Sequence, residues 1–132
     1  AAWGSGDDIV LVALTHGGEV AWQLPRVGAI TGGHGFGTSP IVYGELVILA
    51  RDTERAGDSS LIAVRRETGE IAWQTPRPGG RLNFSTPCVY RNPHTGREEL
   101  IFVAWPIGVT SVNPADGSIN WELEAFQTEK GE

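Results

Sequence analysis

The chain has 132 residues, of which 40% are hydrophobic and 20% are charged, and its formal net charge is −6 at pH 7. With 18 Gly and 8 Pro residues and no long polar tract, this composition excludes a disordered chain and suits one globular, turn-rich domain. The acidic balance argues against a nucleic-acid-binding surface, and no apolar stretch approaches the roughly 18 residues of a membrane span.

Residues 1–37 predict a strand end, one hairpin and a linker, which together make about half of a structural unit. An aliphatic and β-branched run from Ile9 to Val12 predicts a strand. His16-Gly17-Gly18 predicts a tight turn, because Gly reaches positive φ without a steric penalty. The second strand of the hairpin ends at Trp22, and a Gly-rich segment then leads to the next unit.

Residues 38–84 predict a full unit of four strands followed by a linker. Ser39–Tyr43 and Leu46–Ala50 flank a short Gly-containing turn and predict the first hairpin. Leu61–Val64 and a strand ending at Trp73 predict the second hairpin.

Residues 85–132 repeat this plan, with a full unit followed by a C-terminal tail. Thr86–Tyr90 and Leu100–Ala104 predict the first hairpin, joined here by a longer turn. Val109–Val112 and a strand ending at Trp121 predict the second. The only cysteine, Cys88, lies in an apolar run and is expected to be a buried, inert thiol.

A Gly-x-x-x-Trp pattern recurs at intervals of 48–51 residues and marks the three units. Its copies are Gly18 with Trp22, Gly69 with Trp73, and Gly117 with Trp121. When the copies are aligned on Gly, Val12 falls in the column of Ala63. An indole has more area than one hairpin can bury, so each Trp is expected to dock on the neighbouring unit.

Four antiparallel strands per repeat of this length are typical of a β-propeller blade, and the sequence predicts an all-β fold of about two and a half such blades. A closed ring needs four to eight blades. Three arrangements remain open: a fragment of a longer propeller, several chains that complete one ring, or an open stack.

The pattern of Ala63, Thr68, Gly69 and Trp73 resembles the tryptophan-docking repeat of the PQQ-like, quinoprotein-type β-propellers, which include BamB-like proteins. Ser39-Pro40 and Thr86-Pro87 are similar to the blade entry of that family. The resemblance implies a partial propeller. It also implies a bacterial, periplasmic or otherwise extracytoplasmic location.

The same family implies two classes of function. Quinoprotein dehydrogenases bind PQQ and Ca²⁺ on the propeller axis, oxidise alcohols or sugars with an Asp base, and in some members carry a vicinal disulfide, which a single Cys88 cannot form. BamB-like members are cofactor-free platforms for protein partners. We expect the second class, with no catalytic, cofactor-binding or metal-binding residue. The expected partners are another protein, and further blades from the rest of a longer chain or from a homo-oligomer.

The linkers between units supply the remaining candidate contacts. Thr31–Gly37 is Gly-rich like a phosphate-binding loop, but it leads into a strand and not into the helix N-terminus that such loops need. Alignment of the two linkers selects His34, Arg81 and Asn83 as candidates that face the central funnel. The alternative is that these side chains only cap turns. The acidic loop Asp52–Asp58 lacks the register of a calcium loop and is expected to be a solvated surface.

Overall fold

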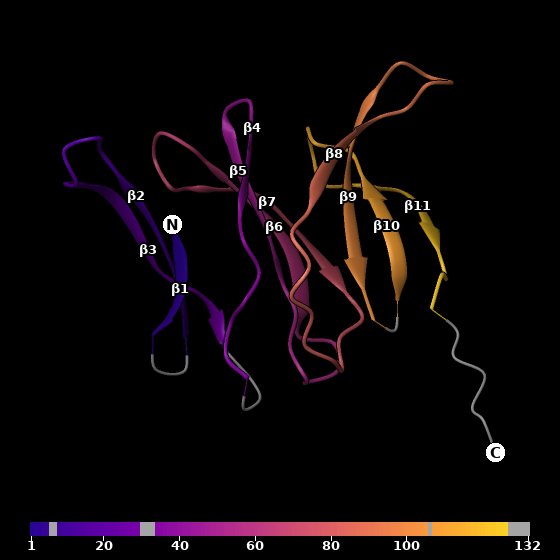
Figure 1. The fold of residues 1–132 in the computed structure, drawn as a ribbon, viewed down its shortest axis with the longest axis horizontal. Coiled ribbons are helices and arrows are strands. Elements are labelled where there is room, and N and C mark those ends of the chain that lie inside the picture. The colour runs from indigo at the N-terminus through magenta and orange to yellow at the C-terminus, as the bar shows by residue number, and fades with distance from the viewer. Residues whose placement is uncertain (6–7, 30–33, 106, 127–132) are drawn as a thin grey trace.

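The computed structural model describes residues 1–5, 8–29, 34–105 and 107–126, which form eleven strands and no α-helix (Figure 1). The strands are β1 (Ala2–Ser5), β2 (Asp8–Leu14), β3 (Val20–Ala29), β4 (Ile41–Tyr43), β5 (Leu46–Arg51), β6 (Ser59–Arg65), β7 (Ile71–Arg77), β8 (Cys88–Arg91), β9 (Glu98–Ala104), β10 (Gly108–Val112) and β11 (Ile119–Leu123). In the described part of the chain, no helix is long and apolar enough to cross a membrane.

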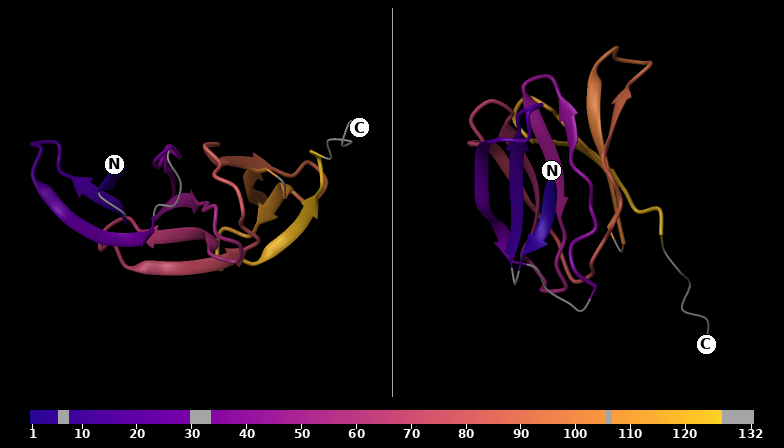
Figure 2. Two further views of the ribbon diagram at one scale, coloured as in Figure 1. Left: turned by 90° about the horizontal axis from the view of Figure 1, so that it is seen from below. Right: turned by 60° about the vertical axis from the view of Figure 1, so that its left-hand side comes forward.

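The strands form three antiparallel sheets, in each of which strands adjacent in sequence are paired. Sheet 1 has the order β1-β2-β3, sheet 2 has β4-β5-β6-β7, and sheet 3 has β8-β9-β10-β11. The sheets stand side by side along a shallow arc, with β3, β7 and β11 on its convex side (Figure 2). This arrangement confirms the predicted all-β fold as a partial β-propeller, in which each sheet is one blade.

Apolar side chains fill the two interfaces between sheets. Ile9 and Leu11 of sheet 1 pack in one cluster with Leu49 and Ile62 of sheet 2. A second cluster joins sheets 2 and 3, and its buried members are Ile48, Ala50, Leu61, Ala63, Trp73, Leu100, Phe102 and Val112. Burial of each large apolar side chain stabilises the fold by about 1.5–3 kcal/mol. Sheet 2 is therefore covered on both faces, and every residue of β6 except Arg65 is buried.

The turns β6–β7 and β10–β11 share one geometry. The Gly69 amide donates to the Arg65 carbonyl at 2.8 Å, and the Gly117 amide donates to the Asn113 carbonyl at 2.9 Å. Both glycines have positive φ, 76° and 75°, a region that L side chains rarely adopt. The end of the molecule that holds these turns is called the turn end, and the opposite end, which holds residues 34–40 and 78–87, the linker end.

The turn β2–β3 is one residue shorter. Here the Gly18 amide donates to the carbonyl of Thr15, only three residues before it, at 3.0 Å. The strand register then pairs Ala13 with Trp22, just as it pairs Ala63 with Trp73. The predicted alignment of Val12 with Ala63 is therefore wrong by one residue. Ala13 corresponds to Ala63, because the β2–β3 turn is one residue shorter than the β6–β7 turn.

Cys88 corrects a second expectation. The thiol was expected to be buried, but Cys88 is exposed, as is every residue of β8. The apolar run that contains it forms the first strand of sheet 3, at the edge of the sheet. An edge strand pairs on one side only, so the apolar sequence alone did not ensure burial.

Candidate functional site

Trp22, on β3, joins sheet 1 to sheet 2. Its Nε1 donates a hydrogen bond of 2.7 Å to the Arg66 carbonyl, 44 residues away. The ring lies directly over Gly69, because a Cβ built on that glycine would be 2.6 Å from Cε3 of the indole. A residue without a side chain is therefore required at this point of the turn.

Trp73, on β7, makes the same contact with sheet 3. Its Nε1 donates to the Pro114 carbonyl at 3.0 Å, and its ring covers Gly117, whose added Cβ would lie 2.5 Å from Cε3. Thr75 adds a hydrogen bond of 2.6 Å from Oγ1 to the Gly117 carbonyl. Trp73 is only 8% exposed, so this indole is a buried anchor between two sheets.

Trp121, on β11, is the third tryptophan of the Gly-x-x-x-Trp pattern, but its hydrogen-bond acceptor is of a different kind. The indole is 39% exposed, and its Nε1 donates to Oε2 of Glu99 within the same sheet at 2.9 Å. Glu99 also accepts hydrogen bonds from Ser111 Oγ at 2.6 Å and from Asn92 Nδ2 at 2.8 Å. These donors, Ser111 first and Asn92 second, hold the pKa of the Glu99 carboxyl below its usual value. The carboxylate is thus ionised and accepts hydrogen bonds from three side chains.

The face of sheet 3 turned away from sheet 2 is called the open face, and strand pairing identifies its counterpart in sheet 2. Ser111 pairs with Ile101 and Trp121 as Ala63 pairs with Ile48 and Trp73. By the same register, Glu99 occupies the position of Leu46. The exposed large apolar residues of the open face are Val103, Trp121 and Leu123. The open face therefore combines an apolar surface with a polar network that sheet 2 lacks.

The three funnel candidates lie in the linkers, at the linker end. His34 and Arg81 are exposed, whereas Asn83 is half-buried. Asn83 Nδ2 donates to the Trp105 carbonyl at 3.2 Å, and Asn83 Oδ1 accepts from the Trp105 amide at 2.6 Å. Asn83 thus ties a linker to the β9–β10 turn. A funnel-facing role for His34, Arg81 and Asn83 stays a prediction.

The two linkers themselves touch. Thr38 Oγ1 donates to the Asn83 carbonyl at 3.2 Å, and a Cβ added at Gly37 would lie 2.6 Å from the ring of Phe84. The structure therefore brings 37–38 and 83–84 together. Residues 31–33 of the Gly-rich segment 31–37, in which a phosphate-binding loop was considered, lie outside the described residues.

An ion pair that the sequence analysis missed lies inside sheet 2. Arg77 and Asp52 form a bidentate pair in which both side chains are almost completely buried. Burial raises the pKa of the Asp52 carboxyl, and the nearby guanidinium groups of Arg77 and Arg51 oppose that rise. Asp52 was expected in a solvated loop. No sequence signal linked it to Arg77, which lies 25 residues away.

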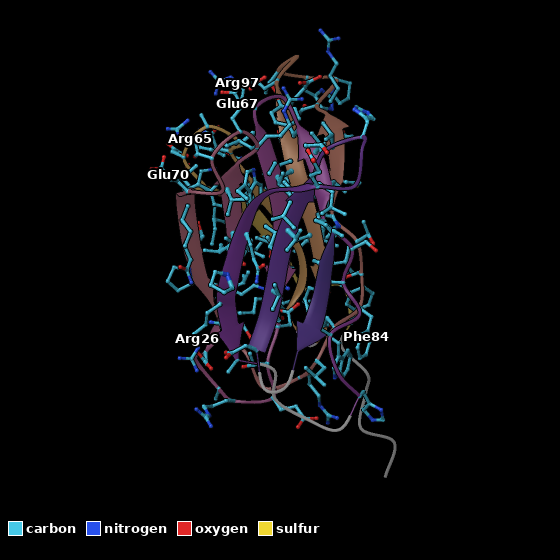
Figure 3. All side chains as sticks on the ribbon, turned by 90° about the vertical axis from the view of Figure 1, so that its left-hand side faces the viewer. Arg26, Arg65, Glu67, Glu70, Phe84 and Arg97 are labelled. Atoms are coloured by element: carbon cyan, nitrogen blue, oxygen red, sulfur yellow. The ribbon has the colours of Figure 1, made fainter. Side chains whose placement is uncertain are left out.

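A groove of about 840 Å³ opens at the turn end between sheets 2 and 3. Its charged lining residues are Glu45, Arg65, Arg91, Arg97 and Glu98. At its base, Tyr43 of sheet 2 donates a hydrogen bond of 2.8 Å to Glu98 Oε2 of sheet 3. This bond raises the pKa of the Tyr43 hydroxyl. Figure 3 shows Arg65 and Arg97 at the turn end, away from Arg26 and Phe84.

The inner strands of sheets 2 and 3 carry no side-chain carboxylate, the ligand type that calcium prefers. Ca²⁺ prefers six to eight oxygen ligands, usually with several carboxylates. β4 carries Ile41, Val42 and Tyr43, and β8 carries Cys88, Val89, Tyr90 and Arg91, so neither strand supplies a carboxylate. Across residues 1–5, 8–29, 34–105 and 107–126, no group of three or more His, Cys, Asp or Glu side chains is arranged to hold a metal ion.

Comparison with known proteins agrees with this architecture. Residues 4–132 match the family model described as outer membrane protein assembly factor BamB. No curated protein matches the chain. Because the family match covers nearly the whole sequence, and the structure consists of stacked antiparallel sheets of three and four strands, the chain belongs to the PQQ-like, BamB-type β-propeller family.

Proposed function

We propose that this chain is a non-catalytic scaffold that binds other proteins, and that its open face stacks against a further blade-type sheet. The observation that supports this function most directly is the apolar surface around Trp121. Trp73 has the same position in sheet 2 and is covered by sheet 3, whereas Trp121 and Leu123 are 39% and 58% exposed. Exposed apolar surface of this kind is typical of protein-binding sites.

The two interfaces inside the chain support a sheet as the occupant. Each one buries apolar side chains and an indole, and each adds a hydrogen bond from the indole to a backbone carbonyl. A further sheet comes either from additional blades of a longer polypeptide or from a second copy of this chain. From the family, we also infer an extracytoplasmic, periplasmic setting in a bacterium.

Self-association of the isolated chain tests this proposal, because a second copy is then the only available sheet. We expect the apparent mass in sedimentation experiments to rise with concentration. Leu123→Asp should reduce this association by placing a charge on the open face. Val42→Asp is the matched control, because Val42 is 61% exposed but lies on the inner strand β4. A chain that remains monomeric at all concentrations, or that responds equally to both substitutions, would contradict the proposal.

The rival function is that of a fragment of a PQQ- and calcium-dependent alcohol or sugar dehydrogenase. It is tested by titrating the chain with PQQ and Ca²⁺, while following the cofactor absorbance and dye-linked alcohol or sugar oxidation. We expect neither saturable binding nor turnover. Reconstituted oxidation would replace the scaffold function with the enzymatic one.

A further inference from the structure

The groove at the turn end is built from four separate elements. The β4–β5 turn and the β6–β7 hairpin of sheet 2 form one wall, while the β8–β9 hairpin and the β10–β11 turn of sheet 3 form the other. It lies between sheets 2 and 3, whereas Trp121 lies on the opposite face of sheet 3. The groove and the open face therefore lie on opposite sides of sheet 3 and meet at its turn end, where Arg97, Glu98 and Asn113 line both the groove and a second cavity beside Trp121.

Three arginines line this groove without a carboxylate partner among the described residues. Arg65 ends β6, Arg91 ends β8, and Arg97 lies in the β8–β9 turn. The ion pairs of the described residues use Arg26, Arg51, Arg66 and Arg77 instead. The groove therefore gathers three of the ten Lys and Arg residues of a chain whose net charge is −6.

The two carboxylates of the groove are already engaged. Glu45 forms an ion pair of 3.1 Å with Arg66, which does not line the groove. Glu98 Oε2 accepts a hydrogen bond of 2.8 Å from the Tyr43 hydroxyl. Neither carboxylate is paired with the three arginines. The guanidinium groups of Arg65, Arg91 and Arg97 therefore remain available to an acidic ligand.

The backbone that carries these arginines is held by a hydrogen-bonded turn. The Asn92 amide donates to the Arg97 carbonyl, and the Gly96 amide donates to the Asn92 carbonyl, both at 2.8 Å. Asn92 Oδ1 also accepts the His94 amide at 2.9 Å. Across the groove, the Arg65 amide donates to the Glu70 carbonyl at 2.7 Å. Both walls are therefore ordered before a ligand arrives, which reduces the entropy lost on binding.

We propose that this groove binds an extended acidic peptide segment of a partner protein, whose carboxylates pair with Arg65, Arg91 and Arg97. Guanidinium groups recognise carboxylates through two parallel hydrogen bonds, and arginines placed on both walls suit a segment that runs between them. Leu46, Ala72 and Pro114 supply apolar contacts along the lining. The inference rests on the proposed function only in that the ligand belongs to a protein.

Binding is measured by fluorescence anisotropy with a labelled glutamate-rich peptide, and with a lysine-rich peptide of equal length. We expect saturable binding of the acidic peptide only. The double variant Arg91→Gln/Arg97→Gln should weaken it by about tenfold or more. The matched control is Arg26→Gln/Arg55→Gln, which removes two arginines from the linker end and should leave the affinity unchanged. Circular dichroism confirms that each variant is folded.

Three results would overturn the acidic-peptide site: no binding of the acidic peptide by the wild type, equal losses in both double variants, or displacement of the peptide by inorganic phosphate at constant ionic strength. The last result would indicate a general anion site. Leu123→Asp separates this inference from the scaffold proposal. We expect that variant to bind the peptide normally while it loses self-association, so each function can fail alone.

Discussion

Sheets 2 and 3 carry the same Gly-x-x-x-Trp pattern and the same four-stranded order, yet they treat the tryptophan differently. Trp73 is buried against sheet 3 and donates to a backbone carbonyl there, whereas Trp121 stays exposed and donates to Glu99 of its own sheet. Leu46 and Ala63 of sheet 2 correspond to Glu99 and Ser111 of sheet 3. The Gly-x-x-x-Trp pattern therefore fixes the position of the indole on its strand, and the indole is buried only where a neighbouring sheet covers it.

The difference also shows how the open face holds a carboxylate. Glu99 has three hydrogen-bond donors within sheet 3 and needs no neighbour to satisfy it. A buried carboxylate without such donors would lose the solvation that water provides. A sheet that stacks on the open face must either leave this network intact or replace the Trp121 donor.

The largest contrast is expected between the two tryptophans themselves. Trp73→Ala should lower the free energy of unfolding by about 3–5 kcal/mol, because it empties a buried site between two sheets. Trp121→Ala should cost about 1–2 kcal/mol, because that ring is only partly buried. Urea unfolding followed by circular dichroism measures both. Equal losses would mean that burial of the Trp73 indole against sheet 3 adds nothing to the stability.

A glycine comparison tests the docking turns. Gly117→Ala should cost about 3 kcal/mol, because it combines a strained positive φ with a Cβ that would clash with Trp73. Gly18 has a similar φ of 86°, but a Cβ there would meet nothing within 4 Å. Gly18→Ala should therefore cost only about 1 kcal/mol of conformational strain. Thermal unfolding of the two variants checks the difference, and similar melting temperatures would refute it.

A smaller effect is expected two residues after each tryptophan. Thr75→Val should cost about 1 kcal/mol, because it removes the hydrogen bond to the Gly117 carbonyl across the interface. Leu123 has the corresponding position in sheet 3 and is exposed. Leu123→Thr should therefore be nearly neutral in the monomer. Urea midpoints of the two variants at low protein concentration give the comparison.

The smallest contrast is a pH dependence specific to sheet 3. Because the folded-state pKa of Glu99 lies below its usual value of 4.5, ionised Glu99 stabilises the fold above that pH, and this contribution is lost as the pH falls through the lowered pKa. Glu99→Gln should thus lose less stability than the wild type on acidification below pH 4.5. Leu46→Gln, at the matched position of sheet 2, should retain the wild-type acid dependence.

The fold could be predicted because its signal repeats. Each glycine and tryptophan recurs at a fixed separation, and the area of an indole predicts a contact with the neighbouring unit. The sequence did not identify Gly69 and Gly117 as the residues that Trp22 and Trp73 cover. The shorter β2–β3 turn was missed, because alignment on Gly18 conceals a deletion that precedes it. Exposure of Cys88 was missed, because an apolar run does not reveal that its strand lies at a sheet edge.

The polar features were harder to predict, since they depend on contacts between residues distant in sequence. Asp52 meets Arg77 and Glu99 meets Trp121 only after the strands have paired. Neither pair has a recognisable spacing. The groove arginines come from three elements, so their convergence required the stacked sheets. The linker candidates His34, Arg81 and Asn83 remain predictions, although Asn83 is now seen to fasten the β9–β10 turn.

The short β2–β3 turn makes the two ends of the stack different. Thr15 corresponds to Arg65 and Asn113, because all three carbonyls accept the amide of the turn glycine, so His16 stands where Arg66 and Pro114 each receive an indole. A Cβ added at Gly18 would meet nothing within 4 Å, whereas an indole covers both Gly69 and Gly117. Sheet 1 thus offers an uncovered turn and sheet 3 an exposed indole, so copies would join head to tail, and the rotation between them would decide between a closed ring and an open fibre.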